Sequence, residues 1–130
     1  MNTVSLPPVQ HEAKAPKPKH KFKDPAKVPQ PIQLALKKAM ALEKMPADWF
    51  DDMLWILAQE SEGNIGIRNQ QGSSARGLFQ LTKVNYHLLP RGKESFGNAV
   101  EECQGGIRYV VGRFHTAAAA RRFWEKHLWY

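Results

Sequence analysis

The chain has 130 residues, of which 42% are hydrophobic, so it can build one compact core but not a second one. Lysine and arginine outnumber the acidic residues by 19 to 12, and the single cysteine, Cys103, excludes an internal disulfide bond. No stretch approaches the roughly 20 apolar residues of a membrane-spanning helix, and the opening residues MNTVSLPPVQ lack the charged start and apolar run of a secretory signal. We therefore expect a small domain without a membrane span or a signal peptide.

Composition divides the chain near residue 31. Seven of the nine prolines precede Ile32, all nine glycines lie at or beyond Gly63, and residues 1–45 hold nine lysines against three acidic residues. Because residues 1–31 carry few large hydrophobic side chains, they cannot offset the entropy of ordering, and we expect a disordered or extended basic arm before a domain at 32–130. The arm either docks on an acidic partner, such as nucleic acid, an anionic wall polymer or another protein, or is a solvated tail.

Two helices are predicted at the start of the domain. Apolar residues recur at four-residue steps over 31–45, which predicts a helix that ends before Pro46. A second apolar face runs from Ala47 to Glu60, and the stop signals Glu-Gly-Asn follow closely. Glu60 is thus predicted in the last turn of this helix, where its side chain can face a cleft.

The second half of the domain is predicted to be a loop followed by two more helices. Residues 63–77 hold four glycines and many amides and hydroxyls, a composition typical of an irregular loop or short hairpin. Apolar periodicity predicts a helix over 98–114, which tolerates its Gly-Gly pair only if other residues pack closely there. Thr116 can cap a last helix over 117–127. The predicted fold class is therefore mainly α.

The cysteine, the histidines and the last two aromatic residues do not indicate a further catalytic or metal site. Cys103 lies inside an apolar helical pattern, which favours an inert core residue over a nucleophile. The five histidines are dispersed without ligand spacing, so we expect no metal site. Trp129 and Tyr130 are interpreted as core anchors or as sugar contacts.

Glu60 is the candidate catalytic residue. Cleavage of a glycosidic bond near neutral pH needs an acid that still holds its proton. A carboxyl group placed among Ile56, Leu57 and Phe79 would have its ionisation disfavoured by desolvation, as a general acid requires. The alternative is a solvated or structural glutamate, which is the common role of such a residue at the end of a helix.

Four sequence blocks follow one another across roughly residues 47–130. Glu60-Ser61 closes a helix, a glycine-rich loop leads to the turn GLFQ at 77–80, and the blocks GGIRYVVGRF and FHTAAAARRFW follow. In order and spacing these blocks resemble the soluble lytic transglycosylase family, and in particular its short phage-borne members. The resemblance implies a goose-lysozyme-like helical domain whose partner is the glycan strand of peptidoglycan.

The resemblance also implies a reaction. Family members cleave the β-1,4 bond between N-acetylmuramic acid and N-acetylglucosamine. One glutamate, at the position of Glu60, protonates the leaving oxygen and then acts as base on the muramic carbon-6 hydroxyl, which gives a 1,6-anhydro end. The substrate's N-acetyl group stabilises the cationic intermediate, so neither a second carboxylate nor a cofactor is required. By the same matching, the substrate-binding residues are Ser61, Gly77, Leu78, Phe79, Gln80 and Tyr109.

Some of these residues also fit structural roles. Ser61 can hydrogen-bond to the backbone at its helix end, and Tyr109, on a helical stripe, can be a core residue. Glu62, which stands where the family commonly has glycine, fits a solvated position. The chain also departs from the family pattern, because it lacks an Ala-Tyr-Asn motif and has His115 where a glycine is expected.

Two other functions are weighed against catalysis. The first is an inactive lysozyme-like module that binds glycan or builds a virion, with the basic arm as its docking device. The second, nucleic-acid binding, is disfavoured because the charge lies in an arm and no base-reading motif is present. The expected setting is a phage virion or the host cytoplasm, with action on the cell wall. The sequence leaves open whether cleavage produces 1,6-anhydro ends, by transglycosylation, or reducing ends, by hydrolysis.

Overall fold

The computed structural model describes Val9 and residues 22–130, and this part of the chain is mainly helical. Its α-helices are α1 (Gln30–Leu42), α2 (Phe50–Ser61), α3 (Ala99–Phe114) and α4 (Ala117–His127). Short 3-10 helices lie at η1 (Pro25–Lys27), η2 (Ala47–Trp49), η3 (Lys83–Leu88) and η4 (Gly92–Ser95). The described residues form isolated bridges between Arg76 and both Arg68 and Leu81, but no strand. The predicted mainly α class is therefore confirmed.

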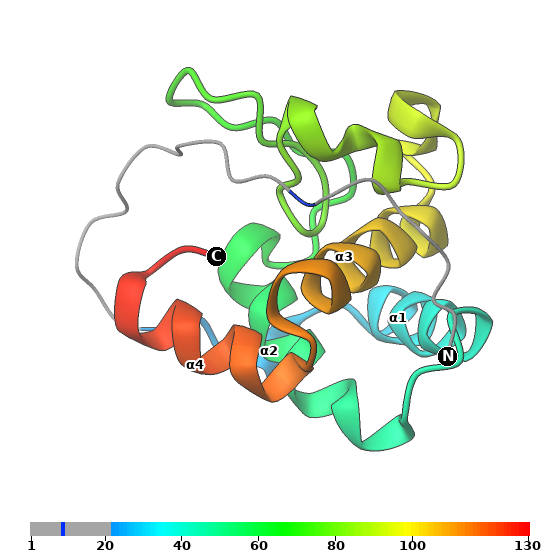
Figure 1. The fold of residues 1–130 in the computed structure, drawn as a ribbon, viewed down its shortest axis with the longest axis vertical. Helices are drawn as coiled ribbons and strands as arrows, with labels where there is room; N and C mark the ends of the chain where they lie inside the picture. Colours follow the sequence, from blue (N-terminus) through cyan, green and yellow to red (C-terminus); the bar gives the residue numbers. More distant parts are fainter. Residues whose placement is uncertain (1–8, 10–21) are drawn as a thin grey trace.

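The helices pack together, and the segment between α2 and α3 lies above them in the view of Figure 1. α1 packs mainly along α3, and α2 packs against both α1 and α4. The loop at 63–77 is irregular, as predicted, and turns back through the two bridges. None of the helices in Val9 and 22–130 is long and apolar enough to cross a membrane.

Local sequence signals set the helix ends. α1 stops three residues before the predicted end, because Lys44 adopts a left-handed backbone (φ 58°). Thr116 caps α4 as predicted, since its Oγ1 accepts a hydrogen bond from the Ala119 amide at 3.1 Å. Glu62 is also left-handed (φ 57°) and ends α2, which confirms that Glu60 lies in the last turn.

The Gly-Gly pair of α3 is a packing site, as expected. A Cβ atom on Gly106 would overlap the ring of Phe79, and one on Gly105 would overlap Leu89. These glycines let the segment between α2 and α3 lie directly on α3. One turn earlier on the helix, Cys103 is fully buried, and burial raises the pKa of its thiol well above the usual value. The position predicted for Cys103, a residue of the hydrophobic core, is confirmed.

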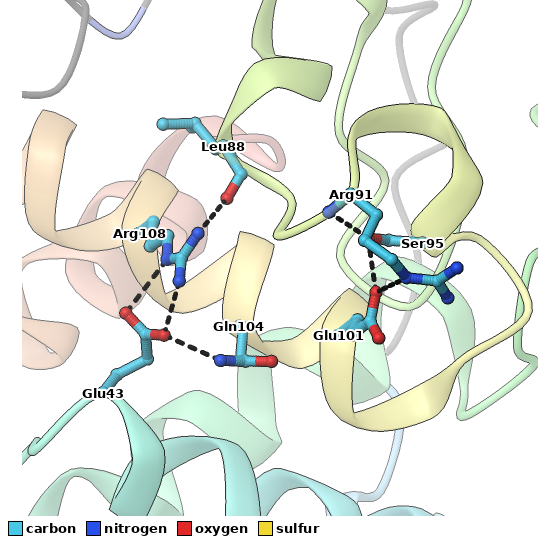
Figure 2. A network of polar contacts seen from close by, with 7 residues as sticks. All are labelled: Glu43, Leu88, Arg91, Ser95, Glu101, Gln104 and Arg108. Carbon is cyan, nitrogen blue, oxygen red and sulfur yellow. Dashed lines mark hydrogen bonds and ion pairs between the residues drawn. The ribbon is translucent and has the colours of Figure 1, made fainter.

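Glu43, just after α1, ties that helix to α3. Figure 2 shows its carboxylate accepting from Arg108 Nε and Nη2, at 3.0 and 2.9 Å, and from Gln104 Nε2 at 2.9 Å. Arg108 also donates to the Leu88 carbonyl at 3.0 Å. Burial alone would raise the pKa of Glu43, but the hydrogen bonds from Arg108 and Gln104 and the Arg108 charge together lower it below 4.5.

We expect acid to weaken this link. The Glu43 carboxyl titrates near 4.5 when unfolded and lower when folded, so its contribution is complete above that pH and is lost as pH falls through the folded pKa. The loss should be on the order of 1 kcal/mol, because the pair is partly exposed. Urea unfolding between about pH 3 and pH 7 measures it. In the Glu43→Gln variant, the free energy of unfolding should fall less steeply as the pH is lowered. An equal dependence on pH in the variant and the wild type would contradict this role of Glu43.

Part of the predicted arm lies on the helical domain. Residues 1–8 and 10–21 lie outside the described part, whereas residues 22–31 are described. The side-chain amide of Gln59 pairs with the backbone of Lys23, accepting from its N–H at 2.7 Å and donating to its carbonyl at 2.9 Å. The Phe22 ring contacts Trp55 and Trp124, with centroid distances of 5.2 and 6.1 Å. The chain thus meets the domain before Ile32, the predicted boundary.

Candidate functional site

Glu60 lies at the end of α2 and is only 9% exposed. Glu60 continues the apolar face of α2, as its spacing in the sequence predicts, and α2 packs against α4. There Trp124 Nε1 donates a hydrogen bond to Glu60 Oε2 at 2.7 Å. This bond fixes the orientation of the carboxyl group, because Trp124 is itself buried.

Two buried tyrosines lie within electrostatic reach of Glu60. Burial raises the pKa of Tyr109; Arg113 opposes this rise and the negative charge of Glu60 adds to it. Burial likewise raises the pKa of Tyr130 well above its usual range, and Glu60 adds to that rise. Both phenols therefore keep their protons at neutral pH. Glu60, Tyr109, Trp124 and Tyr130 are called the Glu60 cluster below.

The cluster joins three helices and the chain end to the 77–80 turn. Tyr130 is fully buried, and its hydroxyl donates to the Phe79 carbonyl at 2.6 Å. The Tyr109 and Tyr130 rings meet edge to face, with centroids 4.9 Å apart. Trp129 and Tyr130 were predicted as core anchors or sugar contacts, and Tyr130 is a core anchor. The structure therefore brings Tyr109 and Phe79, two of the predicted site residues, into the surroundings of Glu60.

The 77–80 turn is held from inside the protein. Leu78 and Phe79 are buried, and Gln80 Nε2 donates to the carbonyls of Ile67 and Gly77, both at 3.0 Å. Gly77 has a left-handed backbone (φ 86°), and a Cβ atom there would lie 2.8 Å from a carboxylate oxygen of Glu102. The Phe96 ring lies 2.9 Å from the same position, so the left-handed backbone and two close neighbours, Glu102 and Phe96, require glycine at position 77.

Ser61 bonds to the end of its own helix. Its hydroxyl donates to the Leu57 carbonyl at 3.3 Å and accepts from the Gly63 amide at 3.1 Å. This is the backbone hydrogen bonding weighed as the alternative to a substrate contact. Ser61 therefore fixes the backbone directly after Glu60.

Sequence reasoning missed Glu102, a carboxylate that is only 2% exposed. Its Oε1 accepts from the amides of Gly66 and Leu78, at 3.1 and 2.7 Å, and its Oε2 accepts from the amide of Gly97 at 2.7 Å. Three chain segments thus meet on one side chain. The available signal was its position four residues before Gly106, on the same helix face as the glycine that receives Phe79.

Neither a family model, nor a curated protein, nor a solved structure matches this chain.

Two other acids near α2, Glu62 and Asp52, are paired with basic residues. Glu62 lies 3.7 Å from Lys23 Nζ and is largely exposed, as predicted for a solvated residue. Asp52, in the first turn of α2, pairs with Arg121 at 3.2 Å. Among the residues that the structure describes, no three His, Cys, Asp or Glu side chains are grouped so that they could hold a metal ion.

A surface pocket of about 580 Å³ lies on the other side of α2 from Glu60. Ala58 and Glu62 line it, and Glu60, two residues after Ala58 on the helix, faces roughly 160° away from Ala58. The remaining lining residues belong to the segment that precedes α1: Phe22, Lys23, Asp24, Lys27 and Val28. The pocket adjoins the Glu60 cluster through Phe22, whose ring centroid lies 6.1 Å from that of Trp124.

Proposed function

We propose that this chain is a peptidoglycan lytic transglycosylase with a lysozyme-like domain and that Glu60 is its acid/base residue. The observation that carries the proposal is the position of Glu60: a nearly buried carboxyl at the end of an apolar helix, oriented by Trp124 at 2.7 Å. The four sequence blocks that resemble the family provide the substrate and the reaction. The protonated phenols of Tyr109 and Tyr130 add neutral, polar neighbours rather than a second base.

In the proposed reaction, Glu60 acts twice. It first gives its proton to the glycosidic oxygen as the bond to muramic carbon 1 breaks. The resulting carboxylate then takes the proton of the carbon-6 hydroxyl, whose oxygen closes the 1,6-anhydro ring. No water is consumed, and Glu60 is protonated again at the end. A retaining or inverting glycosidase would use a second carboxylate opposite the acid. The absence of such a role for Glu62 and Glu102, which bind Lys23 and backbone amides, supports the one-carboxylate scheme.

A binding or structural module is the second candidate. The observation in its favour is that the predicted substrate residues make internal contacts: Leu78 and Phe79 are buried, and Gln80 and Ser61 bond to the backbone. A lysozyme-like domain without catalysis would keep these contacts and still bind glycan.

The proposed setting is a phage virion or lysis from the host cytoplasm, with residues 1–31 binding a virion protein. The resemblance of the four sequence blocks to short phage-borne enzymes is the support for this setting. Mass spectrometry of purified particles tests it, because a protein found in lysates but not in particles would not be a virion component.

Digestion of purified peptidoglycan, followed by mass analysis of the released muropeptides, tests the function. The proposal predicts 1,6-anhydromuramic ends. Reducing muramic ends would make the protein a hydrolase that uses the same acid. No release of soluble fragments, with retained binding to the insoluble wall, would identify the binding module instead.

A further inference from the structure

A cluster of aromatic rings surrounds Arg113 where α3 meets α4 and the chain end. The guanidinium carbon lies 5.0 Å from the ring centroid of Phe114, 5.1 Å from that of Phe123 and 5.2 Å from that of Trp129. These distances are within the range of attractive cation–π contacts. Arg113, Phe114, Phe123, His127 and Trp129 are called the Arg113 platform below.

The rings of the platform form a continuous surface. Phe123 is 4.1 Å from His127, 4.9 Å from Trp129 and 5.1 Å from Phe114, measured between ring centroids. All five side chains are half-buried or exposed, so the platform is part of the protein surface. An arginine beside partly exposed aromatic rings can offer apolar contact and charged hydrogen-bond donors to the same ligand.

The platform adjoins the Glu60 cluster through the tyrosines. Arg113 Nη1 donates to the Tyr109 hydroxyl at 2.6 Å, and the Phe114 ring lies parallel to that of Tyr130 with centroids 6.3 Å apart. Tyr109 and Tyr130 each interact with Arg113 and with Glu60. A ligand group on the platform is therefore separated from the Glu60 carboxyl by these two side chains.

The local charge is positive. α4 carries the exposed cations Arg122 and Lys126 beside His127, whereas the nearby Arg121 is paired with Asp52 and Glu125. This surface therefore favours a ligand with a negative charge over a neutral one.

We infer that the Arg113 platform is a subsite for a muramic sugar, with the rings against the sugar and Arg113 binding a carboxylate on its substituent. The inference rests on the proposed function, because that function supplies the muramic sugar. The carboxylate belongs either to the free lactyl group of a peptide-free strand or to the peptide attached there. Arg113 would then distinguish muramic acid from N-acetylglucosamine, which has no anionic substituent.

The test is a binding measurement that needs no catalysis. Isothermal titration of the full chain carrying Glu60→Gln uses three ligands: a chitin tetrasaccharide, the peptide-free muramic tetrasaccharide and its peptide-bearing form. We expect at least one muramic ligand to bind about tenfold more tightly than the chitin ligand, as a charge-assisted hydrogen bond at the surface would provide. Raising the salt concentration to about 1 M should shrink the preference.

Arginine variants test whether the preference for muramic ligands depends on Arg113. Arg113→Gln should remove it, and Arg113→Lys should retain part of it. Arg91→Gln, which changes an exposed arginine that pairs with Glu101 near the opposite end of α3, should leave it unchanged. Equal binding of all three ligands, a preference that survives Arg113→Gln, or one that does not respond to salt would overturn the inference. If Arg113→Gln does not fold, the lysine variant and the salt series decide.

The outcomes also separate this inference from the proposed function. A muramic preference that depends on Arg113, in a chain that releases no muropeptides, would leave the subsite standing and remove the catalysis. Muropeptide release, together with equal binding of muramic and chitin ligands, would support the catalysis and remove the subsite. A preference shown by the peptide-bearing ligand alone would assign the carboxylate to the peptide.

Discussion

Glu60→Gln is expected to lower the rate of muropeptide release by a factor of about 10²–10⁴ and to leave the fold intact, which is the usual contribution of a general acid or base. Glutamine has the same shape and can still accept the hydrogen bond from Trp124, but it cannot supply a proton to the leaving oxygen. Initial rates of fragment release from purified peptidoglycan measure the effect. Circular dichroism and thermal unfolding show whether the variant is folded.

Glu62→Gln is the matched control, since it makes the same chemical change two residues later. Glu62 is exposed and contacts Lys23 at 3.7 Å, so its replacement should change the rate by less than about twofold. A similar loss in both variants would point to a general effect of charge near α2. A Glu60→Gln protein that keeps most of the wild-type rate would remove Glu60 from the reaction.

Glu102→Gln should destabilise the protein more than Glu60→Gln does, with a loss of about 2–3 kcal/mol in the free energy of unfolding. Both oxygens of Glu102 accept hydrogen bonds, from three backbone N–H groups in total. An amide has one acceptor oxygen and one NH2 group, so at least one of these buried N–H groups loses its partner. The melting temperature should fall by on the order of 10 °C in a domain of this size.

The neighbouring Glu101 provides the control for that prediction. Its carboxylate binds Arg91 and Ser95 near the surface, both at 2.8 Å (Figure 2). Glu101→Gln should cost less than about 1 kcal/mol, because water can replace the lost contacts. Equal losses at positions 101 and 102 in thermal unfolding would show that the three backbone contacts do not matter for stability.

Much of the fold could be predicted from local patterns in the sequence. The spacing of apolar residues located α1, α2 and α3, the capping residue Thr116 located α4, and the stop signal after Ser61 placed Glu60 in the last turn of α2. The Gly-Gly pair predicted a close packing partner, and Phe79 and Leu89 are that partner. These features depend on residues close together in the chain, where spacing alone determines which side chains share a face.

Features that depend on distant residues were not predictable in the same way. Trp124 is 64 residues from Glu60, and Leu78 is 24 residues from Glu102, so no spacing rule connects them. η3 and η4 were missed because 3-10 turns lack a helical apolar period. The contact of residues 22–31 with α2 was missed because it depends on the backbone of Lys23, which composition does not reveal.

The bond between Trp124 and Glu60 also gives the protein an internal optical probe. The indole of Trp124 donates to the carboxyl group and lies 5.5 Å from the ring of Trp55. Any change in the protonation of Glu60, or any ligand that displaces it, alters the surroundings of an emitting side chain. Occupancy of the site can therefore be followed from the intrinsic fluorescence of the unlabelled protein, and the Trp124→Phe variant isolates the signal of this one indole from those of the other tryptophans.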